Sequence, residues 1–425
     1  MGRASQPPRR SRGLPGRAAR AADTPRPVPC QICSADTVPG LDLGHQPISD
    51  RLLSAADLNR PEVFYPMRLH HCPQCGLTQL GYIVPPEEVY RDFPFVSGTT
   101  KTARRHLQSL PARLVRMARL GRRSFAVDIG SNDGTLLEGY ARHRVRVLGI
   151  DPAGDPVRMA VARGIATLHA FFNVDTAKYI RRKHGPADAI TAAGVFGHIA
   201  DLDGVMRGVA HLLGPRGIFV SDNQYLLDMF ERLHYDNMFH QHLRYYSLRP
   251  MLHLHEKYGL EVFDVDRSEV YGGSFRVYAA RPGAFGVSRR VATLLALEDE
   301  ARLYEEETWR SFAAKVDARR RTLFDAVQRA VSAGRKVIGL GAPAKAATVC
   351  NYCRLGPEAI SYITEVNPLR IGTYLPGVHI PIVDEQTMFT DPAPADVGIL
   401  FAWNYYDEIV PKLRRRGFQG EVICP

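Results

Sequence analysis

The chain contains no run of about 18 consecutive apolar residues, which a membrane-spanning helix would require. Its first 26 residues also lack the apolar segment of a secretory signal. They carry seven arginines against one aspartate among prolines, alanines and glycines, so we expect a disordered basic tail over residues 1–26. More than half of the net charge of +11 lies in this tail. The rest of the chain is therefore too weakly basic to indicate a nucleic-acid-binding protein, and the tail is either inert or touches an anion.

Cysteine is sparse, and four of the seven cysteines form two Cys-x-x-Cys pairs, Cys30 with Cys33 and Cys72 with Cys75. Without a signal peptide, such pairs indicate a reducing, cytoplasmic location and thiolate metal ligands rather than disulfides. Four thiolates satisfy tetrahedral Zn²⁺ and leave no coordination position open, which predicts a structural zinc site. The alternatives are a redox pair or a chance spacing.

The Gly-x-Gly-x-x-Gly pattern of a dinucleotide site is missing from the first α/β unit. This unit begins with a predicted strand over 125–129, a glycine turn over 130–134 and a helix, and its next strand ends in Asp151. That order is typical of a doubly wound, nucleotide-binding sheet. Residues 102–120, ahead of this unit, predict a helix that is interrupted at Pro111. Later segments predict further strands at 187–194, 217–224 and 271–281.

The first glycine turn favours S-adenosylmethionine (SAM) over a dinucleotide. Only Gly130 and Gly134 match the dinucleotide pattern, and Asp128 precedes them. A carboxylate at this place repels a pyrophosphate but suits the cationic amino-acid part of SAM. Asp151 would then bind the two ribose hydroxyls.

A second α/β unit follows a charged, helical stretch over 286–334. It starts with a strand, a glycine turn and a helix over 336–353. Gly339, Gly341 and Lys345 could cradle a phosphate, or the two glycines could only permit close packing of helix and strand. Candidate strands follow at 360–368, 395–405 and 421–425.

Several segments together resemble the zinc-containing sugar C-methyltransferases, which act on nucleotide-linked 4-keto-deoxysugars in antibiotic biosynthesis. They are the two cysteine pairs, VDIGSNDGTLL, VFGHIADL, HQHLRYYSL, GLEVFDVDR, YGGSFRVYAAR, GAPAKAATVCNYC and EVNPLRIGTYLPGVHIPI. The similarity runs from about residue 27 to the C-terminus, and the cysteine pairs with the NYC and LPGVHIPI segments make it specific.

The resemblance implies an α/β fold in three parts. These are an N-terminal zinc-binding module, a central class I, Rossmann-like SAM methyltransferase domain and a second Rossmann-like domain that helps to hold the nucleotide sugar. We expect them at residues 27–100, 101–285 and 286–425, behind the tail at 1–26.

Methylation of carbon requires a carbanion, which a neighbouring ketone stabilises as an enolate, and histidine is a suitable base for its formation. In the family a Tyr-x-Glu-His cluster has this duty. Aligning HLRYYSL places its histidine at His242, its glutamate at Gln241 and its tyrosine at Phe239. We therefore interpret His242 as the base, against the alternatives of a buried core residue or a metal ligand.

This chain departs from the family around the reaction centre. Residues 193–198 stand where relatives have an NN-x-F-x-H run, Tyr271 where they have histidine, and Phe93 and Phe95 where they commonly have tyrosine. Two explanations remain open. Either the enzyme acts on a different sugar and Tyr271, Tyr225, Tyr245 or Gln224 replaces the lost donor, or the methyl-transfer reaction has been changed or lost.

The expected site residues fall into three groups besides the zinc ligands. The catalytic group is His242, Gln241, Tyr271 and Phe239. The cofactor group is Asp128, Gly130, Asn132, Asp133, Gly134, Asp151, Pro152, Phe196 and His198, although His198 could also be a packing residue. The substrate group is Tyr225, His240, Tyr245, Lys345 and Asn351.

These features predict a SAM-dependent C-methyltransferase for a nucleotide-linked, dTDP-type 4-keto-deoxysugar. We expect a small-molecule substrate, no nucleic-acid or membrane partner, and a monomer or homodimer. The alternatives are a SAM-binding scaffold and an NAD(P)-dependent sugar reductase, against which Asp128 and the lack of a Tyr-x-x-x-Lys pair argue. A nucleic-acid N-methyltransferase would show D/N-P-P-Y/F after its fourth strand, where this chain has TAAG and VFGH.

Overall fold

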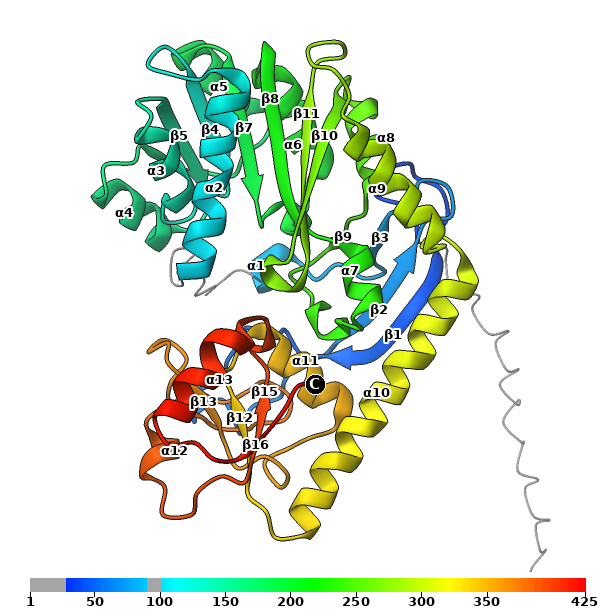
Figure 1. Cartoon of the computed structure of the whole chain (residues 1–425), viewed down its shortest axis with the longest axis vertical. Coiled ribbons are helices and arrows are strands. Elements are labelled where there is room, and N and C mark those ends of the chain that lie inside the picture. Colours follow the sequence, from blue (N-terminus) through cyan, green and yellow to red (C-terminus); the bar gives the residue numbers. More distant parts are fainter. Residues whose placement is uncertain (1–27, 90–100) are drawn as a thin grey trace, which may run out of the picture.

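The computed structural model describes residues 28–89 and 101–425. The predicted tail and the departures at Phe93 and Phe95 lie outside the described residues. The chain forms an open arc, with a seven-stranded sheet at the top of Figure 1, a five-stranded sheet at the bottom and a small antiparallel sheet beside them. The predicted fold class, an N-terminal Cys₄ module followed by two Rossmann-like α/β units, is confirmed.

The small sheet is antiparallel and has the order β1-β2-β3-β9. Three of its strands and the short helix α1 come from the N-terminal segment, whereas β9 comes from the loop that carries His242. Because β3 pairs with β9, the N-terminal module fixes the backbone of that loop. The elements are β1 (Val38–Gln46), β2 (Tyr65–His71), β3 (Thr78–Leu80), α1 (Pro86–Val89) and β9 (Arg244–Tyr245).

The large sheet has the order β10-β11-β8-β7-β4-β5-β6, and only β11 runs antiparallel to the rest. All five residues of β4 are buried, as expected for a parallel strand covered by helices on both faces. The strands are β4 (Phe125–Ile129), β5 (Arg146–Asp151), β6 (Thr167–His169), β7 (Ala187–Ala193), β8 (Leu213–Gln224), β10 (Glu261–Ser268) and β11 (Ser274–Ala280).

Helix α2 covers one face of this sheet and runs through Pro111, where the sequence predicted an interruption. Packing overrides the proline, because a side chain at Gly139 of α3 would lie only 2.9 Å from the Pro111 ring. The helices are α2 (Lys101–Ala118), α3 (Thr135–Ala141), α4 (Gly154–Ala162), α5 (Val174–His184), α6 (Leu202–Leu212), α7 (Leu226–Glu231) and α8 (Leu248–Lys257), with 3₁₀ turns η2 (Phe196–His198), η3 (Tyr235–Asn237) and η4 (Val270–Gly272).

The lower sheet is fully parallel and has the order β14-β13-β12-β15-β16. Its order reverses beside β12, so the crevice that binds ligands in such sheets lies at the carboxyl ends of β12 and β15. The elements are β12 (Val337–Leu340), α11 (Ala344–Cys353), β13 (Ile363–Glu365), β14 (Ile382–Asp384), α12 (Thr387–Thr390), β15 (Val397–Leu400), η5 (Trp403–Tyr405), α13 (Tyr406–Arg415) and β16 (Glu421–Ile423).

Helices α9 (Arg289–Glu300) and α10 (Glu306–Ser332) form the predicted charged connection. Figure 1 shows α10 running from the upper to the lower sheet along the small module. Trp309 of α10 is buried where it stacks on His71 at 5.1 Å and covers Gly40, at which any side chain would clash with the indole.

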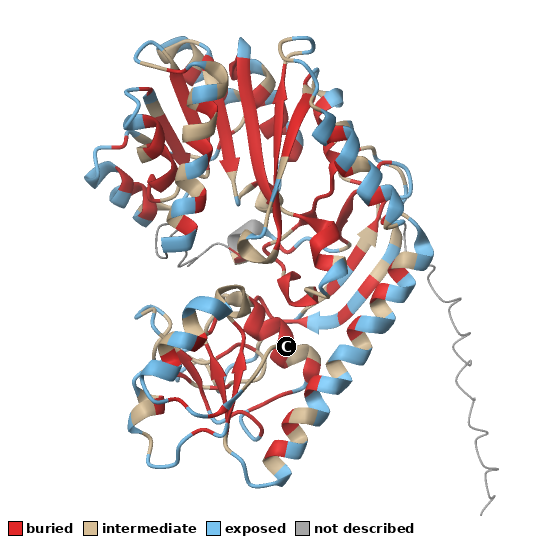
Figure 2. Ribbon diagram, viewed as in Figure 1, coloured by how far each residue is buried: buried red, intermediate tan, exposed pale blue. Residues whose placement is uncertain are grey.

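The central strands of the two α/β sheets are buried, whereas β1 of the small sheet is partly exposed, as Figure 2 shows. No helix among the described residues is both long and apolar enough to cross a membrane.

Candidate functional site

The four paired cysteines converge beside the small sheet. Their sulfur atoms all lie within 4.8 Å of one another, and the Sγ atoms of Cys30 and Cys75, like those of Cys33 and Cys72, are 3.5 Å apart. Tetrahedral Zn²⁺ with Zn–S bonds of about 2.3 Å separates its thiolates by about 3.8 Å. The cluster therefore fits the ion with little movement.

The first glycine turn follows β4. Gly130 has φ +66°, and a side chain there would meet Val195 at 2.6 Å, so the turn requires glycine. Asn132 and Gly134 also have positive φ. The Asn132 backbone N–H donates to a carboxylate oxygen of Asp151 at 2.9 Å, which ties the turn to the end of β5. A hollow opens at this point and is lined by Leu107, Asp128, Gly130, Ser131, Asp133, Thr135, Leu136 and Ala193.

Asp128 lines the hollow, and Asp151 lies beside the turn, where it accepts from the Asn132 N–H. Burial raises the pKa of Asp128 to about 7, and the charge of Asp151 adds to this effect, although the Thr191 hydroxyl donates to Asp128 at 2.5 Å. Burial also raises the pKa of Asp151. A cation bound here would relieve the cost of ionising these groups. The turn is therefore suited to the cationic part of SAM and unsuited to a pyrophosphate.

Three of the residues expected to bind the cofactor make contacts within the protein. Asp133 lines the hollow, but its carboxylate pairs with Arg163 at 3.0 Å. The Pro152 carbonyl accepts a hydrogen bond from His169 at 2.9 Å. Phe196 has no exposed surface and packs in the core. These residues shape the turn and its surroundings.

His242 lies between η3 and β9 and is half-buried. Its Nδ1 atom is 3.0 Å from the Asn237 carbonyl oxygen. Because a carbonyl only accepts, Nδ1 carries the proton and the lone pair lies on Nε2. Burial lowers the pKa of His242 well below its usual value, and the charges of His198 and Lys345 lower it further. The imidazole is therefore neutral at pH 7, as a base must be.

Two rings flank His242. The His198 ring lies edge-on at 4.7 Å, and the Phe239 ring lies at 4.0 Å. Burial lowers the pKa of His198 to about 4. His198 lies three residues after Val195, whose side chain packs on Gly130 of the first glycine turn.

The neighbours of His242 in the sequence turn in different directions. His240 has no exposed surface and packs against β2 of the small module, which makes it a packing residue rather than a substrate contact. The Gln241 side chain is also fully buried, with its Nε2 atom 3.5 Å from Asp50. The ring of Tyr245 lies 6.0 Å from that of His242.

The other tyrosines lie elsewhere. The structure corrects the expectation that Tyr225 contacts substrate, because this side chain is fully buried and its hydroxyl donates to Glu298 at 2.9 Å. Tyr271 has φ +60° and lies with its ring 5.9 Å from His106 on α2. It stands near the cofactor side of the site.

Lys345 projects from the first turn of α11. It is buried, with its Nζ atom 2.5 Å from Asn404 Oδ1 and 3.9 Å from the centre of the Trp403 ring. Burial lowers the pKa of Lys345 to about 8, although the charge of Asp236 opposes this shift. Asp236, from η3, accepts a hydrogen bond from the Trp403 indole at 2.6 Å. The crevice of the lower domain thus faces the loop that holds His242.

The second glycine turn has the close-packing role, which is one of the two that the sequence left open. A side chain at Gly339 would clash with neighbouring strands, so this glycine serves close packing. Gly341 has φ +77°, and the Ala342 N–H donates to Glu365 at 3.0 Å, as Asn132 does to Asp151 in the first turn. Asn351 donates to two backbone carbonyl groups, so its amide fixes α11 rather than standing free for substrate.

Sequence reasoning missed two polar clusters. Asp50 of the small module faces Gln241. His106, Asp222 and Arg276 form a buried network, with Asp222 accepting at 2.7 Å and 2.8 Å from the other two. Although burial opposes it, these two partners hold the pKa of Asp222 below its usual value. No local motif could reveal either cluster, because their bonded members lie between 54 and 191 residues apart.

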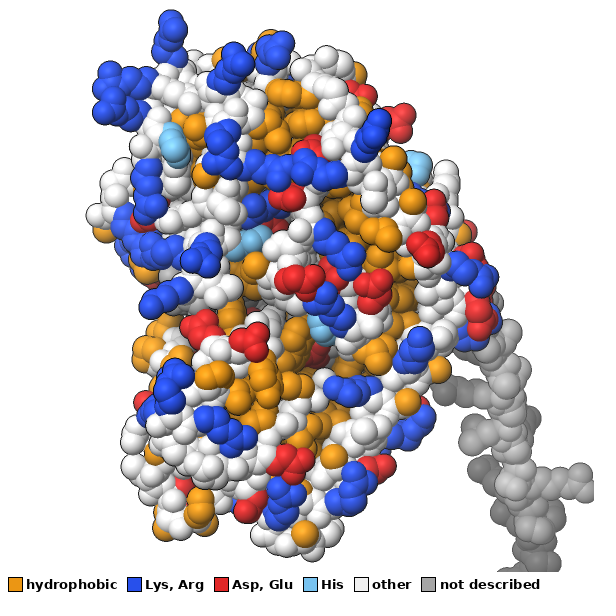
Figure 3. Space-filling model, in the orientation of Figure 1, with side chains coloured by type: hydrophobic (Ala, Val, Ile, Leu, Met, Phe, Trp, Pro, Cys, Tyr) orange, Lys and Arg blue, Asp and Glu red, His pale blue; other side chains and the backbone are white. Residues whose placement is uncertain are grey.

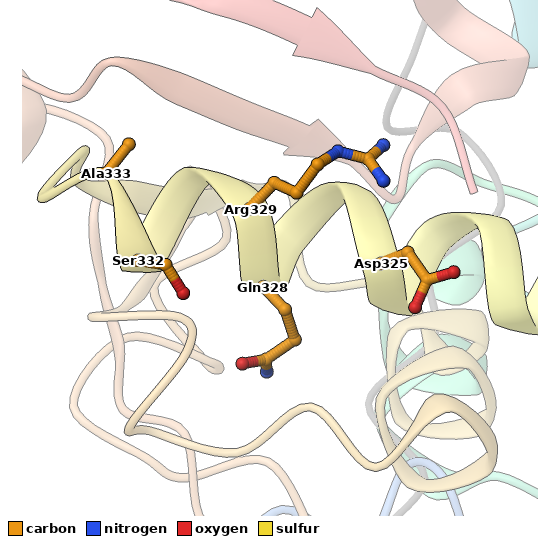
Figure 4. Close-up of a pocket in the computed structure, with 5 residues that line it drawn as sticks. All are labelled: Asp325, Gln328, Arg329, Ser332 and Ala333. Atoms are coloured by element: carbon orange, nitrogen blue, oxygen red, sulfur yellow. The ribbon is translucent and has the colours of Figure 1, made fainter.

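Two surface features lie apart from this site. On the face shown in Figure 3, Lys and Arg side chains are spread over both halves of the molecule rather than gathered in one patch. The hollow in Figure 4 is lined only by the end of α10, through Asp325, Gln328, Arg329, Ser332 and Ala333. It contains none of the expected site residues.

Three family models match the chain in order. They describe a zinc binding domain at residues 30–90, a methyltransferase domain at 101–265 and a C-methyltransferase C-terminal domain at 269–425. The C-methyltransferase NovU from Streptomyces niveus is 32% identical over 392 residues, which cover 91% of this chain and 93% of NovU. A ubiquinone biosynthesis O-methyltransferase from Serratia proteamaculans is 30% identical over 99 residues, 21% of this chain and 39% of that protein.

Among solved structures, the magnesium protoporphyrin IX methyltransferase from Synechocystis PCC 6803 with bound SAH has a TM-score of 0.35 and 15% identity, and covers 42% of this chain and 84% of its own. The family assignment rests instead on NovU, which matches nearly the full length of both chains. The chain therefore belongs to the zinc-containing, SAM-dependent C-methyltransferases that its motifs resemble.

Proposed function

We propose that this C-methyltransferase acts on a nucleotide-linked 4-keto-deoxysugar, of the dTDP type, during synthesis of a secondary-metabolite sugar such as that of an antibiotic. The observation that carries the proposal is the position of His242. Because Nδ1 donates to the Asn237 carbonyl oxygen, the lone pair of the ring lies on Nε2. The ring contacts that of His198, and the charge of Lys345 on the lower domain lowers its pKa.

In the first step, His242 Nε2 takes a proton from the carbon beside the ketone, and the electron pair of that C–H bond moves onto the carbonyl oxygen as an enolate. The low pKa of His242 keeps the base neutral but also makes it weak, so the oxyanion needs a donor. Phe239 cannot donate, and the Tyr225 hydroxyl is bound to Glu298. Tyr245 is buried, so we assign this donation to Tyr271, the candidate tyrosine that keeps exposed surface.

In the second step, the enolate carbon attacks the methyl group that SAM carries on its sulfonium. A C–C bond forms as the C–S bond breaks, and S-adenosylhomocysteine leaves. Asp128 holds the cationic amino-acid part, Asp151 accepts from the ribose hydroxyls, and the glycine turn over 130–134 admits the cofactor backbone. The protonated His242 then returns its proton to water. Catalysis of this displacement is mainly a matter of placement.

Lys345 supplies positive charge to the diphosphate of the substrate at the start of α11. It is the cation that the lower domain turns towards the His242 loop, and its charge already affects the pKa of His242. The four cysteines hold a structural Zn²⁺, because a closed set of thiolates leaves no coordination position for substrate. The working units are the zinc module over 27–100, the SAM domain over 101–285 and the nucleotide-sugar domain over 286–425.

The test uses SAM carrying an isotopically labelled methyl group and a panel of nucleotide-linked ketosugars. We expect mass spectrometry to find the label on a sugar carbon next to the ketone. The enzyme should also exchange that C–H for deuterium from D₂O when S-adenosylhomocysteine replaces SAM. Tight SAM binding with no label on any 4-keto sugar would instead indicate that this chain has changed or lost the reaction.

A further inference from the structure

Gln241, next to His242, contacts the small module. Gln241 stands where the family has glutamate, and its amide Nε2 atom lies 3.5 Å from Asp50 Oδ2. Asp50 follows β1, in the module that carries the four cysteines. A glutamate at position 241 would place two carboxylates side by side, whereas glutamine can donate to Asp50. The amide at 241 and the acid at 50 are therefore complementary.

Asp50 also joins the lower domain. Its Oδ1 atom accepts from the Arg370 guanidinium at 2.7 Å, and only 9% and 11% of the two side chains are exposed. Arg370 in turn donates to the Ala342 carbonyl, in the second glycine turn, at 2.9 Å. Asp50 belongs to the small module and contacts the other two parts of the molecule, through Gln241 and Arg370.

The charge of Asp50 reaches His198. His198 hydrogen-bonds to the backbone of Gln241, and the field of Asp50 raises the pKa of His198 against the effect of burial. The His198 ring contacts that of His242 at 4.7 Å. The cation of Lys345 lowers the pKa of His242. Asp50 and Lys345 therefore act with opposite charges on two rings that are in contact.

We infer that Asp50, a residue of the zinc module, is a positioning residue that supplies the reaction centre with the carboxylate that position 241 lacks. This inference rests on the proposed function. When His242 takes the substrate proton, an imidazolium forms beside His198 and Lys345. The carboxylate of Asp50 offsets that gathering of positive charge and holds the loop through Gln241. Asp50 neither gains nor loses a proton, and no bond to it forms or breaks.

The test removes the carboxylate at position 50, adds one at position 241, and then combines the two changes. Asp50→Asn removes the charge, Gln241→Glu adds a second one, and the double variant Asp50→Asn/Gln241→Glu returns a single carboxylate to the pair. We expect each single variant to lose about tenfold or more in kcat, and the double variant to recover to within about threefold of the native enzyme. The acid limb of the kcat–pH profile should move to higher pH in Gln241→Glu and return in the double variant.

A second measurement needs no sugar. Titration of the histidine side chains by NMR should show a lower pKa for His198 in Asp50→Asn than in the native chain, with recovery in the double variant. Asp42→Asn is the matched control, because it removes an exposed ion pair with Arg68 in the same module and should change neither readout.

Two results would overturn the inference. One is a double variant whose loss in kcat equals the product of the losses in the two single variants. The other is a pKa of His198 that is the same in Asp50→Asn as in the native chain. If the native enzyme fails to label any ketosugar while the NMR shifts occur as expected, the substrate proposal fails and the role of Asp50 stands. Bound zinc, measured in every variant, identifies a variant that has merely lost its fold.

Discussion

At the scale of single residues, His242 has two properties with opposite effects on its strength as a base. Its Nε2 lone pair is free, but burial and two neighbouring cationic or ionisable groups lower its pKa. We expect His242→Ala to reduce methyl transfer by about 10²- to 10⁴-fold, the usual contribution of a general base. SAM affinity should stay within about tenfold, because the glycine turn is untouched. Calorimetry and a labelled-methyl assay measure the two quantities, and His253→Ala, at an exposed histidine of α8, is the control.

The pH dependence of the same residue follows from the sign of its shift. The base works only when neutral, and its pKa lies well below 6.5. The value of kcat should therefore remain level as pH falls through 6.5 and decline only in more acidic buffer. A profile that already declines between pH 8 and 7 would contradict the assignment of His242 as the base.

Asp128 should make SAM binding depend on pH. Its pKa in the free protein is about 7, and the positive charge of the cofactor favours the ionised carboxylate. Binding then releases a proton, so SAM affinity should rise about five- to tenfold between pH 6 and pH 8. Calorimetry in buffers of different ionisation enthalpy measures both the affinity and the proton release. Asp128→Asn should bind SAM with the same weak affinity at both pH values, whereas Asp175→Asn, at an exposed acid, should behave as native.

Residue types in motifs were predictable from the sequence, but their partners were not. The cysteine pairs and the Asp128–Gly130 turn were found because each lies within a few consecutive residues. Asp50 escaped notice because its partner Gln241 lies 191 residues away. Tyr225 was misassigned because a tyrosine next to a strand end gives no indication that its hydroxyl is bound to Glu298, which lies on another helix.

At the scale of elements, the first glycine turn is the most constrained segment of the cofactor site. Gly130→Ala should destabilise the chain in two ways: about 1–2 kcal/mol for the left-handed backbone and about 1–3 kcal/mol for the clash with Val195. Gly164→Ala is a matched control, because that glycine has φ +78° but no atom within 4 Å of an added side chain. Thermal unfolding should show a larger loss in Gly130→Ala than in Gly164→Ala, and only Gly130→Ala should lose SAM affinity. Equal losses would mean that the contact with Val195 is unimportant.

The elements that sequence reasoning found are those with long apolar runs bounded by glycine or an acid, such as 125–129 and the strand ending at Asp151. Those it missed include β1 and β2 of the small sheet, which have nine and seven residues, and several short strands. β9 has two residues and β14 has three, too few to show the alternation of a strand. The predicted break at Pro111 was wrong because contact with α3 holds the helix together.

At the scale of the whole molecule, the zinc module is built into the reaction centre. Its β3 pairs with β9, two residues beyond His242, and its Asp50 faces Gln241. The cofactor turn, by contrast, is made by β4 and β5 of the large sheet. Loss of the metal should therefore displace the His242 loop and leave the SAM hollow in place.

We accordingly expect Cys72→Ser, or treatment with a strong zinc chelator, to abolish methyl transfer while SAM affinity changes by less than about tenfold. Elemental analysis gives the zinc content, and calorimetry gives the affinity. The control is Cys424→Ser, at a half-buried cysteine outside the cluster, which should retain zinc and activity. Far-UV circular dichroism should show helices α2 and α3 of the large domain preserved, because they pack in a core cluster that contains none of the four cysteines. A metal-free chain with full activity would show that the thiolate cluster does not hold the catalytic loop, and simultaneous loss of SAM binding and helicity would show that the module instead supports the entire fold.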